Sequence, residues 1–362
     1  MAWSCARLRC TDLPLLNALA AAFIARLDGL SAAAFGARHL ATTAWSFAKL
    51  GVSHAPLLNA MAARAQATMT EFGAQSLVNT AWAVAKLGYL DAPLRAAIST
   101  RALALMTALS TQDLANLAWS FATLSVADAP LRAAIAAAAR SRQAEFGPQD
   151  LSITAWAFSK IPVRDEPLFE ALASRAICTL TEFGPLSIAN TAWAFSKIGV
   201  SDQPLMDAIA VRSMRILGQF GSQHLSNTLW AYAALNVFHE PLLDALAAAA
   251  LARMGGACSQ HLSMTAWSFA SLLFLHRPSL DAISTASMTT MATFRPQELT
   301  NTAWAFATLG IGDGPLFDAI AAEFRRKIGE CRPRELAVTA LSFARISVQH
   351  RPLLDAIASA AL

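Results

Sequence analysis

The histidines of this chain are the side chains best suited to acid–base catalysis, but their spacing argues against that role. They fall at two positions of a pattern that repeats every 37 residues: His39, His224 and His261 share one, and His54, His239, His276 and His350 share the other. Other copies of the second position carry Asp, which is typical of helix starts and loops. Catalysis needs one unique constellation of groups. We therefore expect no enzyme activity, no small-molecule substrate and no cofactor.

The five cysteines could bind a metal or form disulfides only if their spacing suited it. Cys5, Cys10, Cys178, Cys258 and Cys331 are scattered, odd in number and include no Cys-x-x-Cys pair. This pattern predicts neither a zinc site nor a disulfide framework.

The tryptophans reveal the repeat that positions these residues. Eight of the nine are spaced by 37 residues, and one further step leads to Leu341 in the same sequence context. Trp3 precedes Trp45 by 42 residues, which indicates an insertion around Gly29 to Ala34. The repeats are centred on Trp3, Trp45, Trp82, Trp119, Trp156, Trp193, Trp230, Trp267, Trp304 and Leu341.

Each repeat is expected to contain two helices, A and B. Helix A follows a Phe-Gly pair and ends at a glycine such as Gly88 or Gly199, the residue type favoured just after a helix. Helix B starts at a proline such as Pro93 and carries an acidic residue three positions later in several repeats. One helix pair cannot bury its apolar face alone, so neighbouring pairs must stack. The sequence predicts an all-α protein, an α-solenoid (superhelix) of about ten αα-hairpin repeats that spans residues 1–362 as one array, with the first and last repeats incomplete.

Four positions on helix A lie on one helical face: seven and three residues before Trp, and one and four residues after it. The first is mostly Gln, the second is often Asn, the third is always Ala or Ser, and the fourth is often Lys or Arg. The Asn set is Asn79, Asn116, Asn190, Asn227 and Asn301. The cation set is Arg7, Lys49, Lys86, Lys160, Lys197 and Arg345. Cations can neutralise phosphates and amides can bond base edges, while the small residues would let a ligand approach.

Structural roles compete with this interpretation. Lysine near a helix C-terminus is favourable through the helix dipole alone. Asparagine within a helix could instead bond the neighbouring repeat and hold the stack together. The tryptophans, and the phenylalanines two residues after them, are predicted to be core residues and not platforms for base stacking.

The run L-x-N-T-A-W-A-F-A-K-L-G, recurring along essentially the whole chain, resembles the heptatricopeptide repeats of apicomplexan and related protists. It is similar also to the octotricopeptide repeats of green algae. The resemblance implies an RNA-binding protein of a mitochondrion or plastid, acting in RNA processing, stability, translation or ribosomal RNA assembly, with proteins of such an assembly as further partners. The sequence departs from the family pattern at Thr42, Ile153, Met264 and Val338, which replace Asn and place amide readout there in doubt.

The favoured partner is single-stranded RNA, whose splayed bases a repeating groove can address one repeat at a time. The alternative is a protein-binding α-solenoid scaffold of armadillo or tetratricopeptide type, and a net charge of only +4 leaves it open. No apolar stretch is long enough to span a membrane, so no membrane partner is expected.

Overall fold

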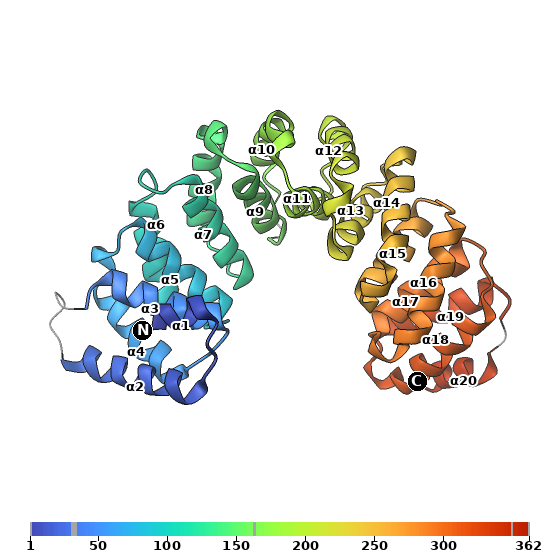
Figure 1. Ribbon diagram of the computed structural model, residues 1–362, viewed down its shortest axis with the longest axis horizontal. Coiled ribbons are helices and arrows are strands. Elements are labelled where there is room, and N and C mark those ends of the chain that lie inside the picture. The colour runs from blue at the N-terminus through green and yellow to red at the C-terminus, as the bar shows by residue number, and fades with distance from the viewer. Residues whose placement is uncertain (1, 30–34, 162–163, 349, 361–362) are drawn as a thin grey trace. The chain divides into compact units, whose positions relative to one another are not determined.

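The computed structural model describes residues 2–29, 35–161, 164–348 and 350–360, and within these ranges it contains helices and turns but no strand (Figure 1). The predicted all-α solenoid is confirmed. The chain divides into two compact units, Met1–Cys178 and Thr179–Leu362. Most of the insertion expected around Gly29 to Ala34 lies outside the described residues, and the prediction of one array over residues 1–362 stays a prediction.

The first unit contains five helix pairs. Its A helices are α1 (Ala2–Leu8), α3 (Ala37–Leu50), α5 (Ala74–Lys86), α7 (Thr111–Thr123) and α9 (Pro148–Ser159). Its B helices are α2 (Leu13–Gly29), α4 (Ala55–Ala67), α6 (Ala92–Ala104), α8 (Ala129–Ser141) and α10 (Glu166–Thr179), the last of which ends at the boundary.

The second unit repeats the arrangement. Its A helices are α11 (Pro185–Lys197), α13 (Ser222–Ala234), α15 (Ser259–Ser271), α17 (Pro296–Thr308) and α19 (Pro333–Arg345). Its B helices are α12 (Gln203–Arg215), α14 (Glu240–Ala252), α16 (Arg277–Thr290), α18 (Gly314–Arg326) and α20 (Arg351–Ala360).

Within each unit the helices form two layers. Helix A of one repeat packs on helix A of the next, and helix B packs on the next helix B, as for α5 with α7 and α14 with α16 (Figure 1). Most A helices also contact the helix B that follows them, as for α5 with α6 and α13 with α14. The layers are therefore held together by contacts between neighbouring repeats, as expected for a solenoid.

The ends of the helices follow the predicted chemistry. At the start of helix B, the side chain of a residue such as Asp91 or His54 accepts a hydrogen bond from the backbone N–H three residues later. This N-cap role explains why His and Asp exchange at that position. Helix A ends before a residue in the left-handed conformation, with φ of 69° at Gly51 and 63° at Gly88, as predicted.

The core lies between the two layers. The phenylalanines two residues after the tryptophans are buried, which confirms that prediction: they are Phe47, Phe121, Phe158, Phe195, Phe269, Phe306 and Phe343. Tyr232 takes the same position in its repeat, where its hydroxyl donates a hydrogen bond of 2.6 Å to the carbonyl oxygen of Met206.

Candidate nucleic-acid interface

One side of the A helices presents the polar positions that the sequence singled out. The glutamines seven residues before Trp and the lysines four residues after it are exposed, while the asparagines between them are half-buried. We call this surface, made by the Gln, Asn, Trp and Lys/Arg positions of consecutive A helices within a unit, the polar A face. The structure therefore brings the predicted Asn and Lys positions together on one surface in each unit.

The asparagine amides have no structural partner. Among the described residues, the side chains of Asn79, Asn116, Asn190, Asn227 and Asn301 form no hydrogen bond to another protein group. An amide that held neighbouring repeats together would bond across the repeat interface, and these five do not. Among the described residues, these amides therefore do not hold neighbouring repeats together by side-chain hydrogen bonds, and their role in binding stays a prediction.

The cations of the polar A face lie beside the tryptophans. The Nζ atom of Lys160 lies 5.1 Å from the centre of the Trp156 ring, and that of Lys49 lies 5.9 Å from the Trp45 ring. Attraction to the ring face holds a cation near the aromatic surface while leaving it in solvent. Arg345 is also exposed, and its Nη1 donates a hydrogen bond of 3.2 Å to Thr308 Oγ1 one repeat earlier.

The tryptophans are only partly buried, so the prediction that they belong to the core holds in part. Their rings pack on one another from repeat to repeat, with centroids 6.3 Å apart for Trp82 and Trp119 and 6.2 Å apart for Trp193 and Trp230. Each ring nevertheless keeps an exposed edge on the polar A face, and Trp3 is 47% exposed. The indoles therefore both hold repeats together and form part of the surface.

The interpretation of the small residue after each tryptophan is wrong. Ser120, Ala194 and Ser268, for example, are fully buried and do not line an approach for a ligand. This position lies on the flank of helix A that faces a neighbouring helix, so a small side chain permits close packing there. The polar A face therefore consists of three of the four predicted positions together with the tryptophans.

Several arginines of helix B bond the backbone of the turn that precedes helix A of their own repeat, which the sequence reasoning missed. The Nε atom of Arg101 donates to the carbonyl oxygen of Phe72 at 2.9 Å, and Arg212 makes the same bond to Phe183 at 3.1 Å. These carbonyls belong to the turn before the preceding helix A. The signal in the sequence is the 37-residue spacing of Arg175 and Arg212, since Arg175 makes the same bond to the carbonyl oxygen of Phe146 at 3.1 Å.

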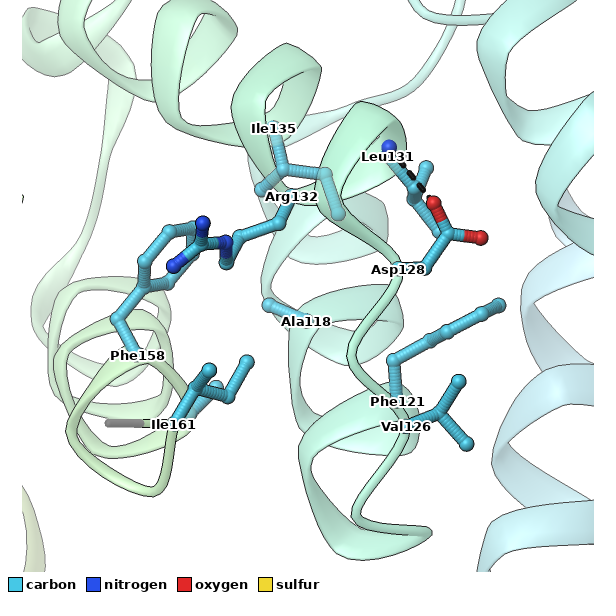
Figure 2. Close-up of a pocket in the computed structure, with 10 residues that line it drawn as sticks. Ala118, Phe121, Val126, Asp128, Leu131, Arg132, Ile135, Phe158 and Ile161 are labelled. Carbon is cyan, nitrogen blue, oxygen red and sulfur yellow. Dashed lines mark hydrogen bonds between the residues drawn. The ribbon is translucent and has the colours of Figure 1, made fainter. Parts of the chain in front are cut away.

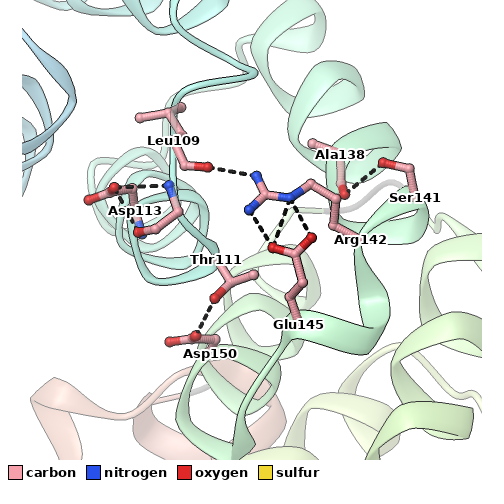
Figure 3. A network of polar contacts seen from close by, with 9 residues as sticks. Leu109, Thr111, Asp113, Ala138, Ser141, Arg142, Glu145 and Asp150 are labelled. Carbon is pink, nitrogen blue, oxygen red and sulfur yellow. Dashed lines mark hydrogen bonds and ion pairs between the residues drawn. The ribbon is translucent and has the colours of Figure 1, made fainter.

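A polar network at the starts of α7 and α9 serves the same structural purpose (Figure 3). Arg142 donates to the carbonyl oxygen of Leu109 at 2.6 Å and pairs with Glu145 at 2.6 Å. The hydrogen bond from Arg142 lowers the pKa of Glu145. Burial raises the pKa of Asp150, although the bond it accepts from Thr111 Oγ1 opposes that shift. The Thr111–Asp150 bond joins α7 to α9 of the next repeat, whereas Arg142 connects groups within one repeat.

A gap lies between α7, α8 and α9, and the residues that line it do not form a set of catalytic groups (Figure 2). It measures about 310 Å³, part of it open to solvent, and its walls include Phe121, Ile135 and Phe158. Arg132 lines the gap and stands at the position that the buried Phe169 occupies in the next repeat. Its one carboxylate, Asp128, accepts the N-cap hydrogen bond from the backbone N–H of Leu131.

Two further observations bear on what the chain binds. Among the described residues, no group of three or more His, Cys, Asp or Glu side chains is arranged to hold a metal ion. No helix in the described part of the chain is long and apolar enough to cross a membrane.

Comparison with known proteins gives one family. A family model described as RNA-editing substrate-binding complex 6 protein matches residues 31–314, which is most of the chain. Among curated proteins, none matches the sequence.

Proposed function

We propose that this chain, which belongs to the RNA-editing substrate-binding complex 6 protein family, binds single-stranded RNA along its polar A face. The family description concerns RNA editing, so the chain is an RNA-associated helical-repeat protein. The observation that carries the proposal is that five asparagine amides, which form no hydrogen bond to another protein group among the described residues, share the polar A face of each unit with exposed cations. Such a surface supplies both kinds of group that nucleic acids require.

Each group has a distinct role in this proposal. Lys49, Lys86, Lys160 and Lys197 neutralise phosphates and fix the position of the backbone. The asparagines bond the edges of bases, because a carboxamide offers one donor and one acceptor in a fixed geometry. Single-stranded RNA fits best because its bases are free to turn toward such groups. The chain itself is proposed to be a binding protein and not an enzyme.

The resemblance to heptatricopeptide repeats extends this proposal to the place of action. We infer that the protein works in an organelle, the mitochondrion or a plastid, in the processing, stability or translation of RNA or in ribosomal RNA assembly. Microscopy of the tagged protein in its native host tests the compartment, and an exclusively cytosolic signal would contradict it.

Protein binding is the second candidate function, and one observation favours it. Phe238 and Leu275, in the loops between helices A and B of neighbouring repeats, are 57% and 53% exposed, and Leu273 is 72% exposed. Exposed apolar residues gathered in this way are typical of protein contacts. These loops are distinct from the polar A face, so both functions are compatible with one molecule.

A direct binding experiment tests the RNA proposal. Retention of mixed-sequence single-stranded RNA is measured by electrophoresis at several salt concentrations for the wild type and for a variant with Lys49, Lys86, Lys160 and Lys197 changed to Ala. For single strands, the logarithm of the affinity falls with the logarithm of salt by about 0.7 per phosphate contacted, so the variant should lose up to about 3 from that slope. Wild-type affinity and an unchanged slope in the variant would refute the proposal.

The amides are tested separately because they should control sequence preference. Changing Asn190 and Asn227 to Val should alter which RNA sequences are selected while leaving the salt slope unchanged. Valine is a matched replacement, since Val338 occupies the same position in the last repeat. A selection experiment that returns the same RNA sequences for the variant and the wild type would exclude these amides from base recognition.

A further inference from the structure

The cations of the polar A face are distributed unequally between the two units. In the first unit, four of five repeats carry a cation four residues after Trp: Arg7, Lys49, Lys86 and Lys160, with Thr123 as the exception. In the second unit, only the first and last repeats do, at Lys197 and Arg345. The three repeats between them carry Ala234, Ser271 and Thr308.

The formal charge of the units follows the same division. Residues 1–178 contain 15 Lys and Arg against 11 Asp and Glu, a net charge of +4. Residues 179–362 contain 13 of each, a net charge of zero. The net positive charge of the chain therefore comes from the first unit alone.

A row of aspartates strengthens the contrast. The fifth residue of every helix B in the second unit is an exposed aspartate: Asp207, Asp244, Asp281, Asp318 and Asp355. In the first unit the same position holds Asn17, Asn59, Ala96, Ala133 and Glu170. The sequence associated these residues with the helix dipole, but the structure places them fifth in helix B, beyond the first turn where the dipole mainly acts, so the dipole gives little reason for them. The second unit thus adds negative charge where the first unit has almost none.

We infer that the RNA backbone is held by the first unit, and that the second unit leaves phosphates uncontacted over the repeats centred on Trp230, Trp267 and Trp304. This inference rests on the proposed function. Three cations of the first unit already lie beside the tryptophan of their own repeat. The Arg7 guanidinium lies 5.0 Å from the centre of the Trp3 ring, and the ammonium groups of Lys49 and Lys160 lie over the rings of Trp45 and Trp156. A side chain already held by an aromatic ring loses less freedom on binding.

The experiment compares two variants of the full chain that remove the same charge from different units. The first changes Lys49, Lys86 and Lys160 to Ala, and the second changes Arg215, Arg277 and Arg351 to Ala, all of which are exposed. The probe is a short oligouridine, and the readout is the salt slope of its affinity. Circular dichroism verifies that both variants retain their helices.

The first variant should lower the salt slope by about 2, while the second should leave it close to the wild-type value. Equal losses of slope in the two variants would overturn the inference while leaving RNA binding itself intact. Absence of oligouridine binding by the wild type would instead refute the proposed function, and this inference with it.

Discussion

Trp267 provides the sharpest test of how the repeats are held together. Its ring lies between those of Trp230 and Trp304, with centroids 6.3 Å away on both sides and interplanar angles of 30° and 31°. The ring is half-buried on helix α15. Changing Trp267 to Ala removes both ring contacts and the apolar surface they cover.

The expected loss follows from the buried area. A buried aromatic side chain covers about 150–250 Å², and for a ring with an exposed edge we take about 120 Å² beyond what alanine covers, worth about 3 kcal/mol. The two ring contacts add about 1–2 kcal/mol. The free energy of unfolding of the repeats around α15 should therefore fall by about 4 kcal/mol. Changing Trp267 to Leu should cost about half as much, because leucine retains part of the apolar contact.

Urea denaturation followed by far-ultraviolet circular dichroism measures this loss. Because each repeat contacts only its neighbours, Trp267→Ala should also broaden the transition or split it. Leu341→Ala is the matched control: Leu341 occupies the tryptophan position in the last repeat and is 60% exposed, so its replacement should cost less than about 1 kcal/mol. If Trp267→Ala shifts the urea midpoint no more than Leu341→Ala, the stacked indoles do not hold the repeats together.

Three further predictions concern stability and use the same assay. Arg212→Ala should cost about 1–3 kcal/mol, because the buried carbonyl of Phe183 loses its hydrogen bond. Burial lowers the pKa of His224 and His261, so the unfolded chain binds protons at a higher pH than the folded chain, and stability should fall as pH drops below the ordinary histidine value near 6.5. Leu273→Gly should stabilise the protein by about 0.5–1 kcal/mol, because Leu273 adopts a φ of 51° that glycine tolerates without strain.

Each of these predictions has a control and a refuting result. Arg215→Ala removes an exposed arginine from the same helix and should be nearly neutral; an equal loss would mean that the carbonyl bond adds nothing. Changing His224 and His261, which are half-buried, to Gln should flatten the loss of stability between neutral pH and about pH 5, and an unchanged pH profile would exclude them. Gly310→Ala is the control for Leu273→Gly. Gly310 has a φ of 69°, and no atom lies within 4 Å of a Cβ added there, so this substitution tests backbone strain alone. If Gly310→Ala does not lower the free energy of unfolding, strain at such a position is negligible.

The helices and their ends could be predicted because they depend on local chemistry that the repeat displays many times. A Phe-Gly pair precedes helix A, Gly or a substitute follows it, and Asp or His with Pro begins helix B. A single occurrence of any of these signals is weak evidence for a helix end. Its recurrence at a fixed spacing along the chain makes the prediction strong. The prediction of buried phenylalanines succeeded for the same reason, since their position points away from every polar position on helix A.

The composition of the polar A face could be predicted only in part. A helical wheel gives the angle between side chains, but it does not say which flank a neighbouring helix A covers. The residue after each tryptophan lies toward that flank, so Ser120 is buried, whereas the tryptophan itself stands at the margin and keeps an exposed edge. The alanine and serine at this position fit close helix packing equally well, and the sequence reasoning did not weigh that possibility.

The replacement of asparagine in some repeats has a consequence for selectivity. If each asparagine that bonds a base contributes about 1–3 kcal/mol of discrimination, then repeats that carry Thr42, Ile153, Met264 or Val338 contribute little to the choice of base. Recognition would then be interrupted along the array, with selective positions separated by tolerant ones. Loss of any single asparagine should relax the choice at one base only, while the cations, which contact every sequence alike, continue to determine the overall affinity. Substituting the asparagines should therefore change the base selectivity with little effect on overall affinity, and substituting the lysines should lower the affinity with little effect on selectivity.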